Sequence, residues 1–176
     1  MLLVNLFGAP GAGKSTGALY ITAHLKAKGI NAEIVTEYAK DKVWENNLEV
    51  FTNQLYIAGH QSQRVSRLNG KVEVAVTDSP LLLSVIYCPE FYHPEFDNLM
   101  LKIHNQYNNI NYYIDRAKKY NPVGRYQTEE ESDNIGKDIQ NFLIKNNIDY
   151  TNIQGTTGYY DRVVDHVVGK LKNGHK

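Results

Sequence analysis

Residues 8–16 have the types and the spacing that a phosphate-binding loop requires. Gly8 to Ser15 reads Gly-Ala-Pro-Gly-Ala-Gly-Lys-Ser, which matches G-x-x-x-x-G-K-[ST] at every fixed position. Glycines let the backbone curl so that successive N–H groups point inward at phosphate oxygens. A short apolar run precedes the loop and a helical pattern follows it, so a helix N-terminus adds its positive dipole end. The motif therefore predicts a site for the phosphates of a nucleotide.

The expected cofactors are ATP and Mg²⁺. In such a loop the lysine, here Lys14, bridges the β- and γ-phosphates, and the hydroxyl of Ser15 is a ligand of Mg²⁺. We also count Lys14 among the catalytic residues. The residues assigned to the cofactor are the nine consecutive ones of the loop: Gly8, Ala9, Pro10, Gly11, Ala12, Gly13, Lys14, Ser15 and Thr16.

A second ligand for Mg²⁺ is expected at Asp78, which ends the apolar run 72–77. Functional residues gather at the carboxyl ends of parallel strands, so Asp78 can hold the metal directly or through water, as a Walker B acid does. Capping a helix that starts near Pro80 is an alternative role, compatible with the first. Motor ATPases and helicases usually place Glu after this Asp to activate water. Ser79 stands there in this chain, which favours a kinase, since a kinase must leave water inactive.

Glu37 is the first candidate for a general base. It lies just past the second predicted strand, and a carboxylate at that end of the sheet can accept the proton of an acceptor hydroxyl. Asp78 is the rival base. The alternative for Glu37 is an exposed acid at the start of a helix.

A basic loop after the fourth predicted strand is expected to form a lid over residues 116–127. Pro122 and Gly124 make the segment rich in turns, and its basic residues are Arg116, Lys118, Lys119 and Arg125. A lid of this kind excludes water and neutralises charge that develops on the γ-phosphate. We favour Arg116 and Arg125 as catalytic residues because guanidinium groups bind phosphate with two donors. A solvated charged loop is the alternative.

Three polar residues share a stripe on a predicted helix over residues 48–68: Gln54, Gln61 and Arg64. The amides are candidates for reading a base or sugar, and Arg64 for binding an acceptor phosphate. An ordinary polar helix face is the alternative. The apolar face of the same helix is expected to contain Leu48, Phe51, Leu55, Ala58, Val65 and Leu68.

Strands that alternate with helices predict an α/β fold of the P-loop NTPase type, a three-layer α/β/α sandwich with a five-stranded parallel sheet. The expected strands span residues 2–7, 32–36, 72–77, 110–114 and 148–153. The expected helices span 14–28, 48–68, 81–87, 95–107, 128–146 and 159–171. Thr128 and Glu131 have capping-box spacing at the start of one helix. We expect one domain, residues 1–176.

The bulk composition excludes few functions. The net charge is zero, with 19 basic and 19 acidic residues, so the chain has no global attraction to nucleic acid or to an anionic membrane. Cys88 is the single cysteine, which excludes an intramolecular disulfide and suits a reducing cytosol. No stretch has the length and hydropathy of a membrane span or a signal peptide. We therefore expect a cytoplasmic protein, in the host cytoplasm if it is phage-encoded.

The sequence resembles small P-loop kinases grouped with the nicotinamide riboside kinases of the bacterial bifunctional type and their phage-encoded relatives. The segments that carry the resemblance are GAPGAGKST at the start, TEYAK from Thr36, VTDSPLLLS around Asp78 and DRAKKYNPVGRYQ from Asp115. The resemblance implies ATP with Mg²⁺ and a hydroxyl acceptor. The resemblance implies that phage members of the group include enzymes that phosphorylate 5-hydroxymethyluracil in DNA, a step of DNA modification. Other relatives act on free nucleosides or nucleotides, or on polynucleotide ends. The adenylyltransferase domain of the bifunctional enzymes is absent, so that activity is not carried over.

The leading hypothesis is an ATP-dependent kinase that phosphorylates a hydroxyl of a nucleoside-like acceptor, either 5-hydroxymethyluracil in DNA or a free nucleoside or nucleotide. A nicotinamide riboside kinase is one alternative. A P-loop ATPase switch or motor subunit, and a nucleotide-binding module without catalysis, are two others. The oligomeric state is left open.

Overall fold

Five short apolar runs form the strands of one parallel sheet. The structure is a computed structural model, and it describes residues 1–89, 95–122 and 127–174. The strands are β1 Leu2–Phe7, β2 Ala32–Val35, β3 Val74–Thr77, β4 Asn108–Asp115 and β5 Thr151–Gln154. Their order in the sheet is β2-β3-β1-β4-β5, and every neighbouring pair is parallel. The predicted P-loop-type sheet is therefore confirmed.

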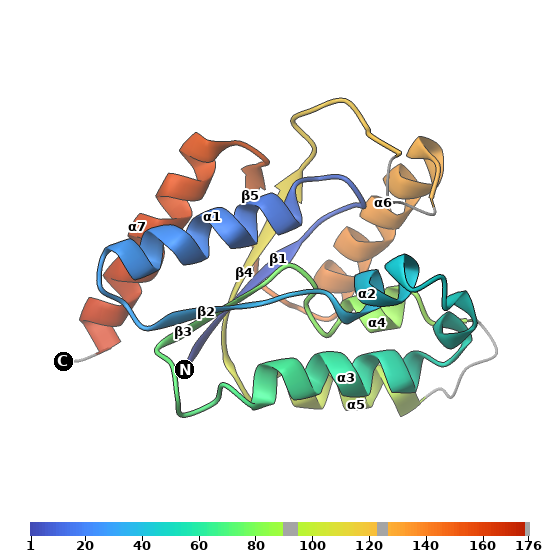
Figure 1. The fold of residues 1–176 in the computed structure, drawn as a ribbon, viewed down its shortest axis with the longest axis horizontal. Coiled ribbons are helices and arrows are strands. Elements are labelled where there is room, and N and C mark those ends of the chain that lie inside the picture. Colours follow the sequence, from blue (N-terminus) through green and yellow to red (C-terminus); the bar gives the residue numbers. More distant parts are fainter. Residues whose placement is uncertain (90–94, 123–126, 175–176) are drawn as a thin grey trace.

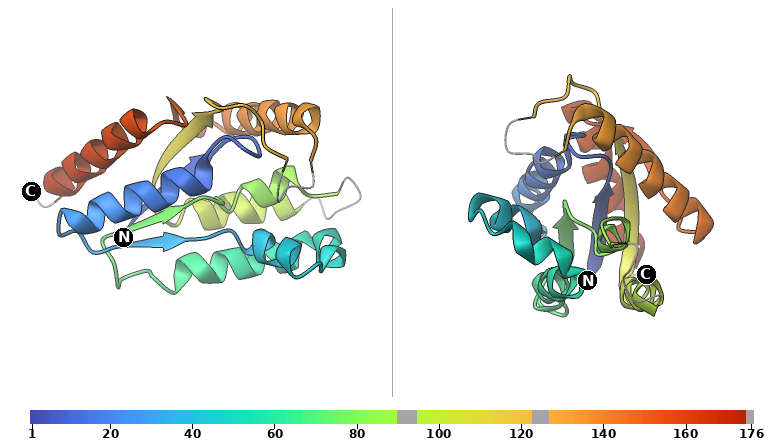
Figure 2. Two further views of the ribbon diagram at one scale, coloured as in Figure 1. Left: turned by 45° about the horizontal axis from the view of Figure 1, so that its top comes forward. Right: turned by 90° about the vertical axis from the view of Figure 1, so that its right-hand side faces the viewer.

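Helices cover both faces of the sheet (Figures 1 and 2). They are α1 Lys14–Ala27, α2 Tyr38–Trp44, α3 Gln54–Ser66, α4 Leu83–Ile86, α5 Glu95–His104, α6 Glu129–Lys145 and α7 Thr157–Gly174, with a 3₁₀ helix η1 at Leu48–Thr52. Helices α1 and α7 lie side by side on one face, while α3, α5 and α6 lie on the other. Among the described residues, no helix combines the length and the apolar character needed to cross a membrane.

Alternation along β1 fills both layers of the core. Val4 and Leu6 pack with α1 and α7, whereas Phe7 packs with residues of α3 to α6. Ala18, Ile21 and Leu25, at helical spacing along α1, are all completely buried. The capping box predicted at the start of α6 is confirmed. The Thr128 hydroxyl accepts from the Glu131 N–H at 3.2 Å, and the Glu131 carboxylate accepts from the Thr128 N–H at 2.7 Å.

The predicted continuous helix over residues 48–68 is wrong in its first part. A 3₁₀ helix ends at Thr52, and Asn53 starts α3 by accepting a hydrogen bond from the Tyr56 N–H at 3.0 Å. The predicted apolar face is right at Ala58 and Val65, which are buried, and wrong at Leu48 and Leu55, which are 44% and 54% exposed. The buried residues of α3 are Gln54, Ile57, Ala58, Gln61 and Val65. Both glutamines of the polar stripe thus point inward, where Gln61 meets the turn that follows β2 and Gln54 donates to the Phe51 carbonyl oxygen.

Other differences are smaller. Helix α2 is absent from the predicted helices, although the alternative role considered for Glu37 places it at the start of a helix. In the structure Glu37 is the N-cap residue of α2. Strands β3 and β5 begin at Val74 and Thr151, two and three residues later than expected, and the predicted helix over 81–87 is a single turn, α4.

Candidate active site

A pocket of about 850 Å³ joins the predicted phosphate loop to Glu37. Residues 10–16 line one end of it, and the expected base, Glu37, also lines it and interacts electrostatically with Lys14. Residues from α2, η1, α3 and α4 line the other end, and Lys118, Lys119, Asn121 and Gln127 come from the predicted lid. The volume suits a nucleotide and a small acceptor, since ligand pockets typically span about 300–1,000 Å³.

The phosphate loop has the backbone that its glycines allow. Gly8 and Gly13 have φ angles of 143° and 107°, in the region where a side chain is strained. A Cβ on Gly8 would lie 2.6 Å from the carbonyl oxygen of Ile114, so only glycine fits there. The Lys14 ammonium donates to the carbonyl oxygens of Gly8 (2.8 Å) and Ala9 (3.1 Å), which holds the lysine against the loop.

The chain after β5 supports this loop, a feature that the sequence analysis missed. The buried hydroxyl of Tyr160 donates to the Gly13 carbonyl oxygen at 3.1 Å. Gly155 lies against the loop so closely that a Cβ there would come within 2.4 Å of the Ala12 carbonyl oxygen. Both Gly155 and Tyr160 line the pocket. The available signal was the place of Gly155 directly after a strand, at the edge where ligands bind.

Asp78 lies beside the phosphate end with an unsatisfied oxygen. The residue is 4% exposed, and its Oδ1 is buried without a hydrogen-bond partner among the described residues. Asp78 is not a helix cap, because α4 begins at Leu83 with Leu82 as its N-cap residue. A buried carboxylate oxygen without a donor fits a cation or its bound water, and Ser15 at the start of α1 offers the hydroxyl.

Asp78 and Ser15 are too few to form a metal site by themselves, but they suit a Mg²⁺ ion whose other ligands are nucleotide phosphates and water. In the parts of the chain that the structure describes, no group of three or more His, Cys, Asp or Glu side chains is arranged to hold a metal ion. Mg²⁺ is usually bound through one or two carboxylates together with substrate phosphates, rather than in an all-protein cage. Asp78 and Ser15 therefore match the expected kind of site.

Glu37 sits between charges of both signs. Burial raises the pKa of its carboxyl above the ordinary value, and this is the largest influence. The cations of Lys14 and Lys40 oppose the increase, while the carboxylates of Asp78 and Asp41 add to it. A carboxylate with a raised pKa next to the phosphate lysine has the properties of a general base.

Beyond Glu37 the pocket is aromatic and apolar, with one buried amide. Trp44, Phe51 and Tyr87 line this end, and Gln54, which is 4% exposed, lines it from the first turn of α3. The Gln54 amide nitrogen donates to the Phe51 carbonyl oxygen at 2.9 Å, which fixes the side chain. Burial and the charge of Glu37 both raise the pKa of Tyr87. Flat apolar walls with one amide suit a heterocyclic base.

The lid residues divide into two groups. Lys118 and Lys119 line the pocket. Arg116 instead contacts α6, where its guanidinium donates to the Ser132 hydroxyl at 2.7 Å and pairs with Asp133 at 2.8 Å and Glu129 at 3.3 Å. Arg125 lies outside the described residues.

Gln61 and Arg64 do not line the pocket, unlike Gln54. Arg64 pairs with Asp41 and donates to Thr36, and Gln61 accepts a hydrogen bond from the Tyr38 N–H. The suggestion that Arg64 binds an acceptor phosphate therefore has no support in this arrangement.

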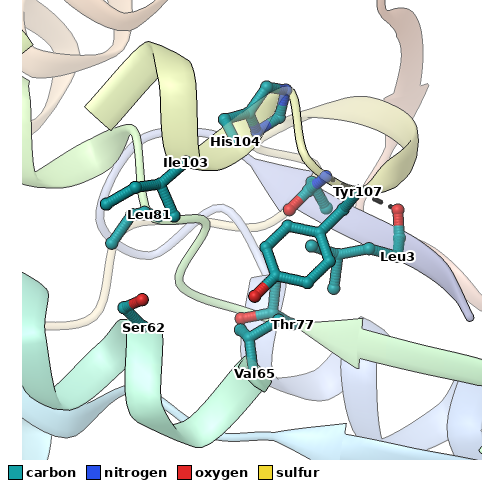
Figure 3. A pocket seen from close by; sticks show the side chains of 9 residues that line it. Leu3, Ser62, Val65, Thr77, Leu81, Ile103, His104 and Tyr107 are labelled. Atoms are coloured by element: carbon teal, nitrogen blue, oxygen red, sulfur yellow. Dashed lines mark hydrogen bonds between the residues drawn. The ribbon is translucent and has the colours of Figure 1, made fainter. Parts of the chain in front are cut away.

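A second cavity is too small for a ligand. It measures about 10 Å³ and lies under the sheet among side chains of β1, β3, α3 and α5 (Figure 3). Figure 3 shows Thr77, His104 and Tyr107 around it. A space of this size holds at most one water molecule.

Comparison with known proteins agrees with this geometry. Residues 3–162 match the AAA domain family, and the chain belongs to this family. A search of curated protein sequences finds no match.

Solved structures with the same fold include deoxyadenosine kinase from M. mycoides in several complexes. The complex with dATP has a TM-score of 0.59 and 18% identity. The complex with the products dCMP and a flexible dCDP has 0.57 and 19%, and the complex with dCTP has 0.55 and 17%. Each comparison covers 97% of this chain and 99% of the kinase chain. At these identities the likeness establishes the fold.

Proposed function

We propose that this protein is an ATP-dependent kinase that transfers the γ-phosphoryl group to a hydroxyl of a free nucleoside. The observation that carries the proposal is the continuous pocket from the phosphate loop, past Glu37, to the aromatic chamber that contains Gln54. In this proposal the pocket combines an ATP site, a general base and an acceptor site, the three parts that phosphoryl transfer needs.

Each part of the pocket has a defined task in this proposal. The inward N–H groups of the loop and Lys14 hold the β- and γ-phosphates, and Asp78 and Ser15 hold Mg²⁺, which neutralises phosphate charge when it is bound. Lys118 and Lys119 add positive charge from the lid side and limit the access of water. We retain Arg125 as a candidate for the same task.

The reaction is a direct displacement. As the acceptor oxygen forms its bond to the γ-phosphorus, the bond from that phosphorus to the bridging oxygen of ADP breaks. The acceptor's proton passes to the Glu37 carboxylate and then to solvent. The products are a phosphate monoester and ADP. The heterocyclic base of the acceptor nucleoside stacks among Trp44, Phe51 and Tyr87, and the Gln54 amide forms hydrogen bonds with its polar edge.

A free acceptor is favoured over a residue within DNA. The acceptor end is walled by side chains from α2, η1, α3 and α4, and the residues that line it are largely apolar. A polynucleotide would need a row of cations along its phosphates, which the zero net charge does not favour. The likeness to deoxyadenosine kinases points in the same direction. Nicotinamide riboside and 5-hydroxymethyluracil in DNA remain the competing acceptors.

ATP hydrolysis is the second candidate function, because the chain belongs to a family described as an AAA domain. Ser79 follows Asp78, where a hydrolytic enzyme usually carries a glutamate, which argues against it. The two functions differ in whether phosphate goes to an added acceptor or to water.

The test is transfer from γ-labelled ATP to deoxynucleosides, ribonucleosides, nicotinamide riboside, nucleoside monophosphates and hydroxymethylated DNA. We expect a labelled free nucleoside monophosphate, and a loss of about 10²- to 10⁴-fold in Glu37→Gln. Glu49→Gln, an exposed glutamate in η1, is the matched control and should keep the activity. Release of labelled phosphate without transfer to any acceptor would contradict the proposal and favour the ATPase.

A further inference from the structure

The turn that carries Glu37 is held from α3 on both sides. The carbonyl oxygen of the preceding peptide, from Thr36, accepts a hydrogen bond from Arg64 Nη1 at 3.1 Å. The N–H of the following peptide, from Tyr38, donates to Gln61 Oε1 at 2.9 Å. Because peptide units are planar, fixing the two units that flank a residue fixes the direction of its Cα–Cβ bond. Helix α3 therefore sets the direction in which the Glu37 side chain leaves the backbone.

The Arg64 guanidinium joins two elements through its planar fork. Nη1 also donates to the Thr36 hydroxyl at 3.0 Å, and Nη2 forms the ion pair with Asp41 in α2. The guanidinium carbon lies 5.2 Å from the centre of the Tyr38 ring. One rigid group thus ties the end of β2 to the first turns of α2, with Glu37 between them. A lysine has a single nitrogen and cannot hold both partners in this geometry.

Gln61 keeps this contact at a cost to stability. The residue is 3% exposed, and its Nε2 is buried without a hydrogen-bond partner in the described part of the chain. An unpaired buried polar group costs about 1–3 kcal/mol. An apolar side chain of similar volume would remove that cost but would leave the Tyr38 N–H without its acceptor. A specific need for the Oε1 acceptor accounts for a glutamine at this position.

The same helix forms a wall of the acceptor chamber. Gln54 and Ile57 line the pocket, and Gln61 lies two turns beyond Gln54 on the same face, roughly 10 Å along the axis. Helix α3 therefore helps to position both the acceptor nucleoside and the general base, Glu37. We propose that Gln61 and Arg64 are positioning residues that hold the Glu37 carboxylate at the acceptor hydroxyl. The proposal rests on the proposed kinase function.

The experiment compares Gln61→Met and Arg64→Lys with wild type in steady-state phosphoryl transfer to the best nucleoside. We expect kcat to fall about ten- to a hundredfold in each, because small displacements of a reacting group have effects of this size. The KM for ATP should stay within about twofold, since neither residue lines the pocket. The melting temperature of Gln61→Met should stay close to that of wild type, because removal of the unpaired amide offsets the loss of the acceptor for the Tyr38 N–H. Gln63→Met, an exposed neighbour on α3, is the control and should resemble wild type.

Glu37→Gln, measured alongside, separates the two levels of the proposal. Loss of transfer in Glu37→Gln together with wild-type kcat in Gln61→Met and Arg64→Lys would overturn the positioning role and leave the kinase function standing. A parallel decline of kcat, ATP affinity and melting temperature would also overturn it, since that pattern belongs to a general structural role. Absence of transfer by wild type would refute the proposed function itself and the positioning role with it. Full turnover by Glu37→Gln would refute Glu37 as the base and therefore the positioning role, while the kinase function would stand.

Discussion

The hydroxyl of Ser132, in α6, donates a hydrogen bond to the carbonyl oxygen of Pro10, in the phosphate loop, with 2.7 Å between the oxygens. The same hydroxyl accepts a hydrogen bond from Arg116 Nη2 at 2.7 Å, and Ser132 is completely buried. One buried hydroxyl thus links the predicted phosphate loop to the first residue of the predicted lid. Arg116 was predicted to contact the transferring phosphate. In the structure it contacts α6 and reaches the loop only through the Ser132 hydroxyl.

Replacing Ser132 by alanine should weaken ATP binding and lower stability. The change leaves the Pro10 carbonyl oxygen without the Ser132 donor and removes one acceptor of the Arg116 guanidinium, and the loss of such hydrogen bonds costs about 1–3 kcal/mol. Chemical denaturation and calorimetry with Mg²⁺ and ATP measure the two effects. Ser66→Ala, at the exposed end of α3, is the control. Unchanged ATP affinity and unchanged stability in Ser132→Ala would show that these hydrogen bonds contribute neither to ATP binding nor to the free energy of unfolding.

Tyr160→Phe tests the support of the phosphate loop from α7. The variant keeps the buried ring but loses the hydrogen bond to the Gly13 carbonyl oxygen, so we expect a stability loss of about 1 kcal/mol. ATP affinity should fall with it, because Gly13 lies at the N-terminus of α1. Tyr159→Phe is the matched control, since its ring packs beside Arg162 away from the loop. Equal affinities in the two variants would contradict the supporting role.

The phosphate loop and the sheet could be predicted because their signals are local. Residues 8–15 carry the loop motif within one stretch of chain, and the apolar runs that form the strands are contiguous. The rule that ligands bind at the carboxyl ends of strands was enough to select Glu37 and Asp78. Both lie beside the loop, as the charge interactions of Glu37 with Lys14 and Asp78 indicate.

The residues that were missed or misplaced depend on tertiary contacts. Tyr160 reaches Gly13 across 147 positions of sequence, and no local pattern marks it among thirteen tyrosines. The predicted buried face wrongly includes Leu48 and Leu55 and omits Gln54 and Gln61, because burial of amides is unusual. It becomes favourable only when Gln61 meets the turn after β2. The partners of Arg116 likewise depend on where α6 packs.

Glu37→Gln should stabilise the protein at neutral pH while it removes activity. The pKa of this carboxyl is raised in the folded state, so the folded protein binds the proton more tightly than the unfolded chain does. Stability from this group is therefore highest at acid pH and is lost as the pH rises through the folded pKa. A neutral glutamine avoids that loss. Thermal melts should show a higher midpoint for Glu37→Gln at pH 7, with a difference that narrows towards pH 4.5, the ordinary value. A lower midpoint at pH 7 would contradict the burial of this charge.

The acid limb of the pH–rate profile should respond to Lys40. A base must be deprotonated to act, so kcat/KM falls as the pH drops through the pKa of Glu37. The Lys40 cation lowers that pKa, and Lys40→Met should move the acid limb to higher pH. Lys26→Met is the control, because Lys26 pairs with Glu33 on the surface of α1 and β2. Identical limbs in wild type and Lys40→Met would argue against Glu37 as the titrating base.

His104 should lower the stability of the protein in mild acid, through an effect that does not involve the candidate active site. Burial in α5, beside the small cavity of Figure 3, lowers the pKa of this histidine from 6.5 to about 4. Between these values the unfolded chain binds a proton that the folded protein does not, so stability falls as the pH drops from 6.5 towards 4. At about 1.4 kcal/mol per pKa unit, the loss amounts to roughly 3 kcal/mol. Denaturation of His104→Leu from pH 7 to pH 4.5 should show a much flatter loss of stability.

His24→Leu separates this effect from the general response of histidines to acid. His24 is an exposed residue of α1 that stacks on Tyr20, and its replacement should leave the pH dependence close to that of wild type. His104 and Glu37 have opposite effects on how the free energy of unfolding depends on pH. Acidification lowers the stability contributed by a buried histidine and raises that contributed by a buried carboxyl group. A Glu37→Gln, His104→Leu double variant should therefore depend less on pH than His104→Leu alone. An unchanged acid slope in His104→Leu would mean that His104 is protonated in the folded protein and that its burial is compensated by a partner.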